Sequence, residues 1–237
     1  MEKIYKPIKR KTVSEEVADQ ITELVIQKHL SPGDRLPTER QLVEDLGVSR
    51  TALREAMKAL SERGLVDVKQ GNGTFIRHPS SSDMSSRFSL FLKNDVVRYL
   101  QLMDVREILE IEIAGRLASG TATAAEIDKM QQHLDRMHGL LDSPAEYAQE
   151  DVAFHVEFYR AMKNEVLLIF MEAIMQLLGD AMEATFIAPG SAESSLRRHQ
   201  KLLDCIRNHD VESARQVMRE IIARGRERLS EAMPVAK

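Results

Sequence analysis

Apolar residues follow a helical spacing in three successive segments near the start of the chain. The first segment, about 12–29, has apolar side chains at positions i, i+4, i+7 and i+8, with Ser14 as a candidate cap. The second, about 38–46, stops at a glycine, and the third, about 49–63, begins at Ser49, a residue type that caps helices. The pattern therefore predicts three short helices.

The spacing changes to alternation directly after the third helix. Residues 65–69 alternate apolar and polar side chains, residues 70–73 carry two glycines typical of a hairpin turn, and residues 74–77 resume as a strand. Three helices followed by a small hairpin predict a winged helix-turn-helix.

The rest of the chain is periodic at helical spacing and shows no strand pattern. Six helices are expected, over about 93–118, 123–141, 145–162, 165–187, 192–207 and 210–232. The expected fold class is mainly α: an N-terminal winged helix-turn-helix with a small β-hairpin wing, and a C-terminal antiparallel all-α bundle of about six helices.

A serine-rich stretch separates the two parts. Five serines, a proline and an aspartate fall within residues 78–86, a composition that favours a linker over a periodic element. The expected organisation is a DNA-binding winged helix-turn-helix at 8–78, a linker at 79–89, and a helical effector-binding and dimerisation domain at 90–233.

Composition and charge narrow the class of protein. The chain is 43% apolar and 30% charged, and no apolar run approaches the roughly 18–20 residues of a membrane span. The N-terminus lacks the apolar segment of a secretion signal, and the single Cys205 excludes an intramolecular disulfide or a Cys-rich zinc module. We therefore expect a cytoplasmic protein that has no membrane partner.

The third helix has features of a helix that reads DNA. Its first turn is small and polar, and Arg50, Arg54 and Lys58 form an i, i+4, i+8 row away from its apolar stripe. Arginine can donate two parallel hydrogen bonds to guanine, and residues 1–78 carry 14 basic against 12 acidic residues while the remainder carries 19 against 25. A charged row is also typical of a solvated helix face, so this row does not decide the function by itself.

The combined motifs are more specific. They are PGDRLPTERQL at 32–42, LGVSRTALREA at 46–56, GL at 64–65 and GNGTFI at 71–76. Together they resemble the GntR family of bacterial transcription regulators over about residues 11–77, with Ala52 where the family often has a larger polar residue. The resemblance, with the first turn of the third helix and the wing, gives these candidate DNA contacts: Arg40, Ser49, Arg50, Thr51, Arg54, Gln70 and Gly71.

Three features of the helical part are candidates for binding a metal ion or a small molecule. Asp151 and His155 are spaced i, i+4 on one helical face, which suits two ligands of one metal ion, and His199 begins a later apolar-periodic stretch. Arg106 lies among apolar residues. Each feature also has a structural interpretation, because a DxxxH pair is often exposed, a lone histidine is often structural, and Arg106 has acidic neighbours at 104, 107 and 110.

Taken together, the motifs of the helical part also resemble a known family. These motifs are Arg106-x3-Glu110-x3-Ala114, Asp151-x2-Phe154-His155, Lys163-Asn164, His199-x2-Leu202 and Asp210-x3-Ala214-x3-Met218. They resemble the ligand-binding domain of the FadR-like branch of GntR regulators over about 93–232. Many members hold a divalent metal through an Asp and three His, and bind a small carboxylate against the metal and an arginine. Asp151, His155 and His199 match three of those ligands, Arg106 matches the arginine, and Ile221 stands in the fourth ligand position.

Two versions of the pocket remain open at this point. A divalent ion (zinc, nickel or manganese) is held weakly by the three ligands and completed by water or an effector oxygen. Alternatively, the pocket binds its effector without metal through Arg106, His155, His199 and Asn164, as do relatives that bind acyl thioesters.

The function expected is that of a sequence-specific transcription regulator. We expect a homodimeric repressor on two-fold symmetric operator DNA, with its affinity controlled by a small organic or sugar acid. The alternatives are a metal-dependent enzyme using Asp151, His155 and His199, and an interaction module that no longer reads DNA. We do not expect an enzyme, because no nucleophile or phosphate-binding motif accompanies the three residues and an enzyme leaves the winged helix unexplained.

Overall fold

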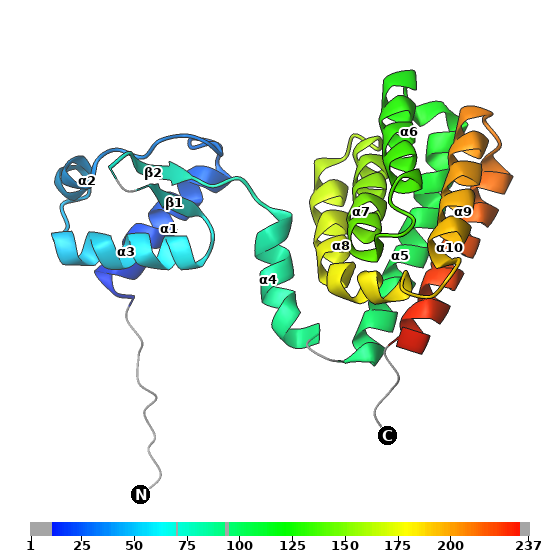
Figure 1. Ribbon diagram of the computed structural model, residues 1–237. Helices are drawn as coiled ribbons and strands as arrows, with labels where there is room; N and C mark the ends of the chain where they lie inside the picture. Colours follow the sequence, from blue (N-terminus) through cyan, green and yellow to red (C-terminus); the bar gives the residue numbers. More distant parts are fainter. Residues whose placement is uncertain (1–10, 70, 93–94, 233–237) are drawn as a thin grey trace, which may run out of the picture. The chain divides into compact units, whose positions relative to one another are not determined.

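The structure, a computed structural model, describes residues 11–69, 71–92 and 95–232. The chain divides into two compact units between Pro79 and Ser80, and each unit has its own hydrophobic core (Figure 1). None of the helices in these ranges combines the length and the hydropathy that a membrane crossing requires.

The first unit contains three helices and one hairpin. These elements are α1 (Val13–Ile26), α2 (Glu39–Leu46), α3 (Arg50–Glu62), β1 (Val66–Lys69) and β2 (Gly73–Ile76). The strands are antiparallel, with Val66 opposite Ile76, and an isolated bridge joins Arg35 to Phe75 on the outer edge of β2. The winged helix-turn-helix predicted from the spacing is confirmed, and the bridge at Arg35 adds a pairing that the pattern did not reveal.

Side-chain caps set the helix ends in this unit. Thr12 caps α1 through a reciprocal capping box with Glu15, so the prediction of Ser14 as the cap is wrong by two residues. Thr38 caps α2 in the same way, and α2 ends where Gly47 takes a left-handed φ of 63°. Ser49 caps α3, as predicted, by accepting the Ala52 backbone N–H at 3.1 Å.

The core of the first unit fixes the orientation of α3. Leu53, Ala56 and Leu60 are buried on one stripe of α3, which packs against α1, and Val66 and Ile76 of the hairpin close the same core. Because this stripe faces inward, the row of basic residues on α3 is directed to solvent.

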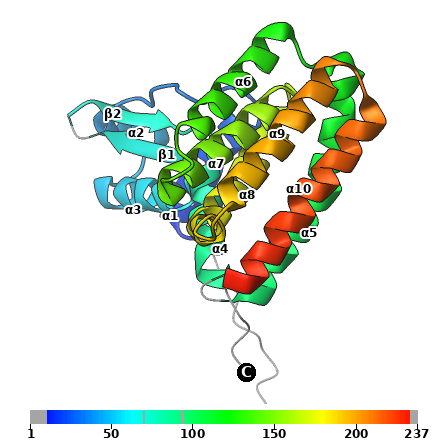
Figure 2. The ribbon, with the colours of Figure 1, turned by 45° about the vertical axis from the view of Figure 1, so that its right-hand side comes forward.

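The second unit is entirely helical over its described residues. It comprises α4 (Ser81–Leu92), α5 (Val96–Arg116), a π-helical turn (Leu117–Thr121), α6 (Ala124–His138), α7 (Pro144–Arg160), α8 (Glu165–Thr185), α9 (Ser191–Arg207) and α10 (Val211–Ala232). Helix α10 packs along α5 and α9, and α7 packs against α6 and α8 (Figure 2). The prediction of a mainly α protein with a helical C-terminal bundle is confirmed, and the six expected helices are present.

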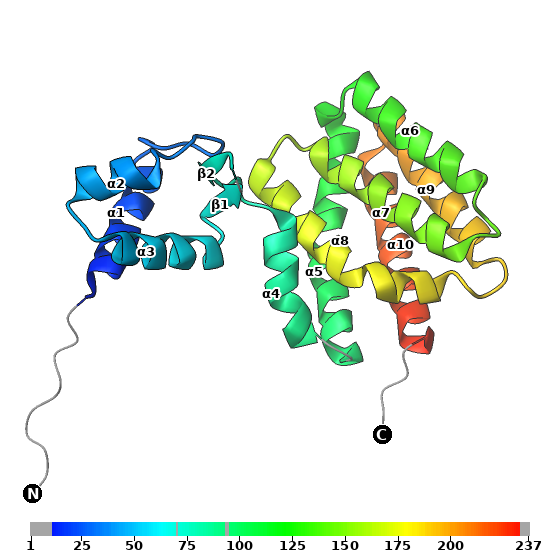
Figure 3. The ribbon, with the colours of Figure 1, turned by 60° about the vertical axis from the view of Figure 1, so that its left-hand side comes forward.

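Helix α4 corrects one expectation. The sequence predicts a linker at 79–89, whereas residues 81–92 form a helix that packs on α8 (Figure 3). At its start, Ser80 Oγ donates to Asp83 Oδ2 at 2.6 Å and accepts the Asp83 backbone N–H at 3.3 Å. The side chain of Gln176 on α8 then bonds to two serine hydroxyls, Ser81 at 3.0 Å and Ser85 at 2.8 Å. The serines that were expected to prevent a helix thus cap it and attach it to the bundle.

Candidate functional site

The helical unit contains a small cavity among α5, α7, α8, α9 and α10. It is lined by Met103, Arg106, Asp151, His155, Met182, Thr185, Phe186, Ser195, Arg198, His199, Ile221, Gly225 and Arg228. Eight of these thirteen residues are polar or charged and converge on the cavity, which suits a polar or charged small molecule.

The structure brings together the three candidate metal ligands. Asp151 and His155 project from α7 and His199 from α9, all three are buried, and their ligand atoms lie within 4.8 Å of one another. His199 Nε2 is 3.2 Å from His155 Nε2 and 3.5 Å from Asp151 Oδ1. Two nitrogens that are each about 2.0–2.1 Å from a tetrahedral zinc ion lie about 3.3 Å apart, close to the separation seen here.

Neighbouring groups indicate which nitrogen of each imidazole carries the proton and which one faces the cavity. His199 Nδ1 lies 2.9 Å from the Ser195 carbonyl oxygen, which only accepts, so the ring proton belongs on Nδ1 and the Nε2 lone pair faces the cavity. Burial lowers the pKa of His199 to about 4, against a smaller opposing effect of Asp151, and keeps the ring neutral near pH 7.

His155 is held in a similar way. Its Nδ1 lies 3.1 Å from Glu110 Oε2, though outside the alignment of a hydrogen bond, and its Nε2 faces the cavity. At 3.2 Å, either one Nε2 donates to the other, or a bound cation accepts the lone pairs of both. The donor set and its orientation therefore fit a divalent metal ion.

The position that the family resemblance assigns to a fourth ligand carries an aliphatic side chain. Ile221 of α10 is 8% exposed and lines the same cavity as the three ligands. A metal ion held by Asp151, His155 and His199 would therefore keep a position for water or for an oxygen of a bound acid.

Arg106 lines the cavity but belongs to a buried network. It is 1% exposed, and its Nε lies 2.6 Å from Glu110 Oε1, which also accepts the Tyr159 hydroxyl at 2.7 Å. Burial alone would raise the pKa of Glu110, but the charge and hydrogen bonds of Arg106 and the effect of His155 together outweigh burial and hold that pKa far below its usual range. Of the acidic neighbours expected for Arg106, Glu110 is the one it pairs with, and this pairing occupies much of the guanidinium.

Asn164 is not part of the cavity. Its side chain is exposed at the start of α8, where Oδ1 accepts the Leu167 backbone N–H at 3.0 Å. The expectation that Asn164 binds effector is corrected to a helix-capping role, because a residue at this helix start lies outside the set that lines the cavity.

The lining residues that the sequence analysis missed include two arginines, Arg198 and Arg228. Both are half-buried, and burial, together with mutual repulsion and that of Arg224, lowers the pKa of each guanidinium. A signal for Arg228 exists in the sequence, because it lies seven residues, or two helical turns, after Ile221 and so shares its face of α10.

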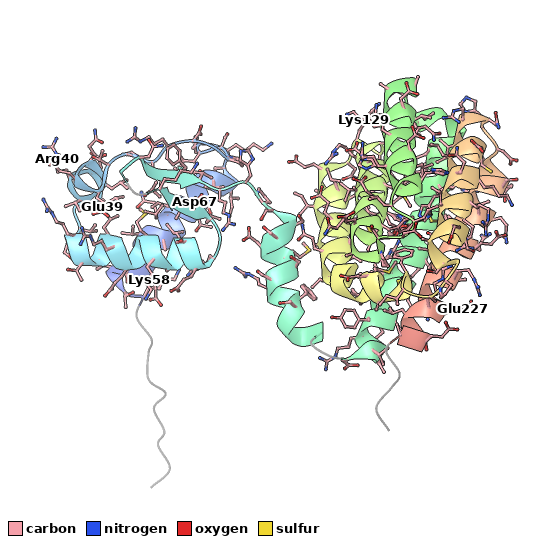
Figure 4. The ribbon with its side chains drawn as sticks, in the orientation of Figure 1. Glu39, Arg40, Lys58, Asp67, Lys129 and Glu227 are labelled. Atoms are coloured by element: carbon pink, nitrogen blue, oxygen red, sulfur yellow. The ribbon has the colours of Figure 1, made fainter. Side chains whose placement is uncertain are left out.

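The candidate DNA contacts lie on the surface of the first unit. Arg40, Ser49, Arg50, Thr51, Arg54 and Gly71 are all exposed, whereas Gln70 lies outside the described residues. Figure 4 labels Arg40 and Glu39 on α2 and Lys58 on α3. Arg54 Nε lies 3.2 Å from Glu39 Oε2, whereas Arg50 has no ion-pair partner in the described part of the unit.

Together the two units define a DNA-binding regulator with a ligand-binding domain. A winged helix exposes its third helix, and a separate helical bundle holds a buried cavity with ligand-binding side chains. Comparisons with known proteins agree: residues 13–76 match the model of bacterial regulatory proteins, gntR family, and residues 101–224 match the FCD domain, the FadR-like C-terminal domain. The chain belongs to the GntR family of transcription regulators and is not an enzyme.

Relatives are similar over most of their length. The HTH-type transcriptional regulator LutR of Bacillus subtilis is 34% identical over 75% of this chain and 83% of its own. The Glc operon transcriptional activator of Escherichia coli is 31% identical over 83% and 81%. The solved structure of Streptococcus agalactiae GntR covers 90% of this chain and 99% of its own, with 25% identity and a TM-score of 0.72.

Proposed function

We propose that a small metabolite acid bound in the cavity of the helical unit controls the operator affinity of this regulator. The observation that carries the proposal is the buried group of Asp151, His155 and His199, whose two imidazole Nε2 atoms lie 3.2 Å apart. Such a group has no structural need in a hydrophobic bundle, because burying unpaired polar atoms costs stability.

The residues that would hold a metal are the same three. A divalent ion bound there supplies a Lewis-acidic position to which an effector carboxylate can bind, beside Arg106. Zinc, nickel and manganese all accept an imidazole pair with one carboxylate. The small size of the cavity supports a metabolite of few carbon atoms over an acyl thioester.

The DNA-bound form would be a homodimer on a two-fold symmetric operator. A single winged helix makes too few base contacts for specific affinity, so two half-sites are needed. In each half-site, Arg50 and Arg54 would form hydrogen bonds with guanine bases. Arg40, Gln70 and Gly71 would contact the DNA backbone or the adjacent groove. Ser49 accepts the Ala52 N–H, which leaves its hydroxyl proton free for a phosphate.

Base reading by α3 gives the first prediction. Arg50→Ala should weaken binding to the operator in the promoter of its own or a neighbouring gene by about 1–3 kcal/mol, since a bidentate guanine contact is lost. Arg54→Ala should have a similar effect, reduced slightly because Arg54 must first leave Glu39. Gel-shift titrations with operator and scrambled DNA at one salt concentration measure both affinities.

Lys58→Ala is the matched control on the same face of α3. Lys58 lies one turn beyond Arg54, and its loss should weaken binding to all sequences alike, as expected of a phosphate contact. If Arg50→Ala and Arg54→Ala also leave the operator-to-scrambled ratio unchanged, their assignment as base readers is wrong.

A further inference from the structure

Two cationic side chains at the cavity form no ion pair within the described residues. Arg198 of α9 and Arg228 of α10 line the cavity beside the imidazoles, and across residues 11–69, 71–92 and 95–232 neither forms an ion pair. Arg198 Nη1 donates to Ser194 Oγ at 2.8 Å, but its buried Nε has no acceptor. A buried donor without an acceptor points to a missing ligand atom.

The other charges of the cavity do not balance this pair. Arg106 is neutralised by Glu110, and Asp151 is the one carboxylate among the lining residues, where it lies 3.5 Å from His199 and belongs to the candidate metal site. Arg198 and Arg228 therefore share the cavity as two cations, and neighbouring Arg224 adds to their repulsion. Crowding half-buried cations costs free energy that an anion between them would offset.

We propose that the effector is a small dianion, with one acidic group at the Asp151, His155 and His199 end of the cavity and the second held by Arg198 and Arg228. This inference rests on the proposed function and adds the class of effector to it. Guanidinium groups suit the second role because they bind carboxylate or phosphate through two parallel hydrogen bonds. The small size of the cavity favours a dicarboxylic or phosphorylated acid of few carbons.

Calorimetric titration of the full chain tests the inference, with zinc present and again after EDTA treatment. Three matched pairs serve as probes: succinate with butyrate, L-malate with L-lactate, and 3-phosphoglycerate with glycerate. The diacid of at least one pair should bind about 10-fold or more tightly than its partner, the factor that one charge-assisted hydrogen bond gives. A preference confined to 3-phosphoglycerate assigns a phosphate to the arginine pair, and one confined to succinate or L-malate assigns a second carboxylate.

Two variants test whether the preference for diacids depends on Arg198 and Arg228. Arg198→Gln and Arg228→Gln should each weaken binding of the preferred diacid about 10-fold and leave the monoacid within about twofold. Arg197→Gln, an exposed neighbour outside the cavity lining, is the control and should leave both affinities unchanged.

Two outcomes would overturn the inference. Monoacids and diacids could bind equally, or the preference could persist in Arg198→Gln and Arg228→Gln. If acid binding is nevertheless lost in Asp151→Asn, the proposed function stands and only the assignment of a dianionic effector is wrong. If no probe binds the wild-type protein, the cavity is not an acid site, and both proposals are wrong.

Discussion

Replacing Arg106 with alanine is expected to lower the free energy of unfolding of the helical unit by about 3–5 kcal/mol. The cause is the carboxylate of Glu110, which is fully buried and would lose its guanidinium partner at 2.6 Å. Its remaining neighbours, the Tyr159 hydroxyl and the His155 ring, do not replace the permanent charge and bidentate geometry of a guanidinium. Urea unfolding followed by far-UV circular dichroism measures the change.

Two further variants separate this cause from a general loss of packing. Arg106→Met combined with Glu110→Gln removes both charges, and should recover much of the lost stability because no unpaired carboxylate remains. Arg116→Ala removes an exposed i, i+4 partner of Glu112 on the same helix and should leave the unfolding midpoint nearly unchanged. An Arg106→Ala protein as stable as wild type would show that the buried pair contributes nothing.

Replacing Ile221 with histidine is expected to raise metal affinity by about 100-fold. Ile221 lines the cavity beside the three ligands, so the new imidazole would fill the fourth position. Structural zinc sites with four ligands bind with about 10–16 kcal/mol, or roughly 3 kcal/mol per ligand, which corresponds to about two orders of magnitude. Competition with a chromophoric chelator measures the affinity for zinc, nickel and manganese.

Two control variants, one on α10 and one on α9, accompany this prediction. Arg219→His places an imidazole on an exposed position of α10 and should leave the affinity unchanged. His199→Ala removes one of the three donors and should lower affinity by a factor similar to the gain in Ile221→His. No gain in Ile221→His, together with no loss in His199→Ala, would mean that the three residues do not bind metal.

Much of the fold could be predicted from the sequence because residues close together in the chain determine the helix ends and the strands. The cap at Ser49, the helix end at Gly47 and the alternation over 65–69 each act over a few residues, and each is found where expected. Helix α4 was missed because its stability comes from a distant contact. Serines with low helix propensity are held by Gln176, about 90 residues further along the chain.

The candidate site was predictable in part for a similar reason. The i, i+4 spacing of Asp151 and His155 fixes their common face, and the family resemblance indicated His199 and Ile221. The pairing of Arg106 with Glu110 was one alternative among several, which only the packing of α5 against α7 decides. Arg198 and Arg228 have no motif, because their role depends on how α9 and α10 approach each other.

The most direct test of the account is the operator affinity of the full chain with and without an acid bound in the cavity. Fluorescence anisotropy of labelled operator DNA measures it, with zinc and L-malate or succinate as probes, for wild type and for Asp151→Asn. The account predicts a 5–150-fold change in wild-type affinity, which corresponds to about 1–3 kcal/mol of coupling. It also predicts no change in Asp151→Asn, whose affinity without acid should equal that of wild type. An equal response of both proteins to the acids would contradict control through this cavity.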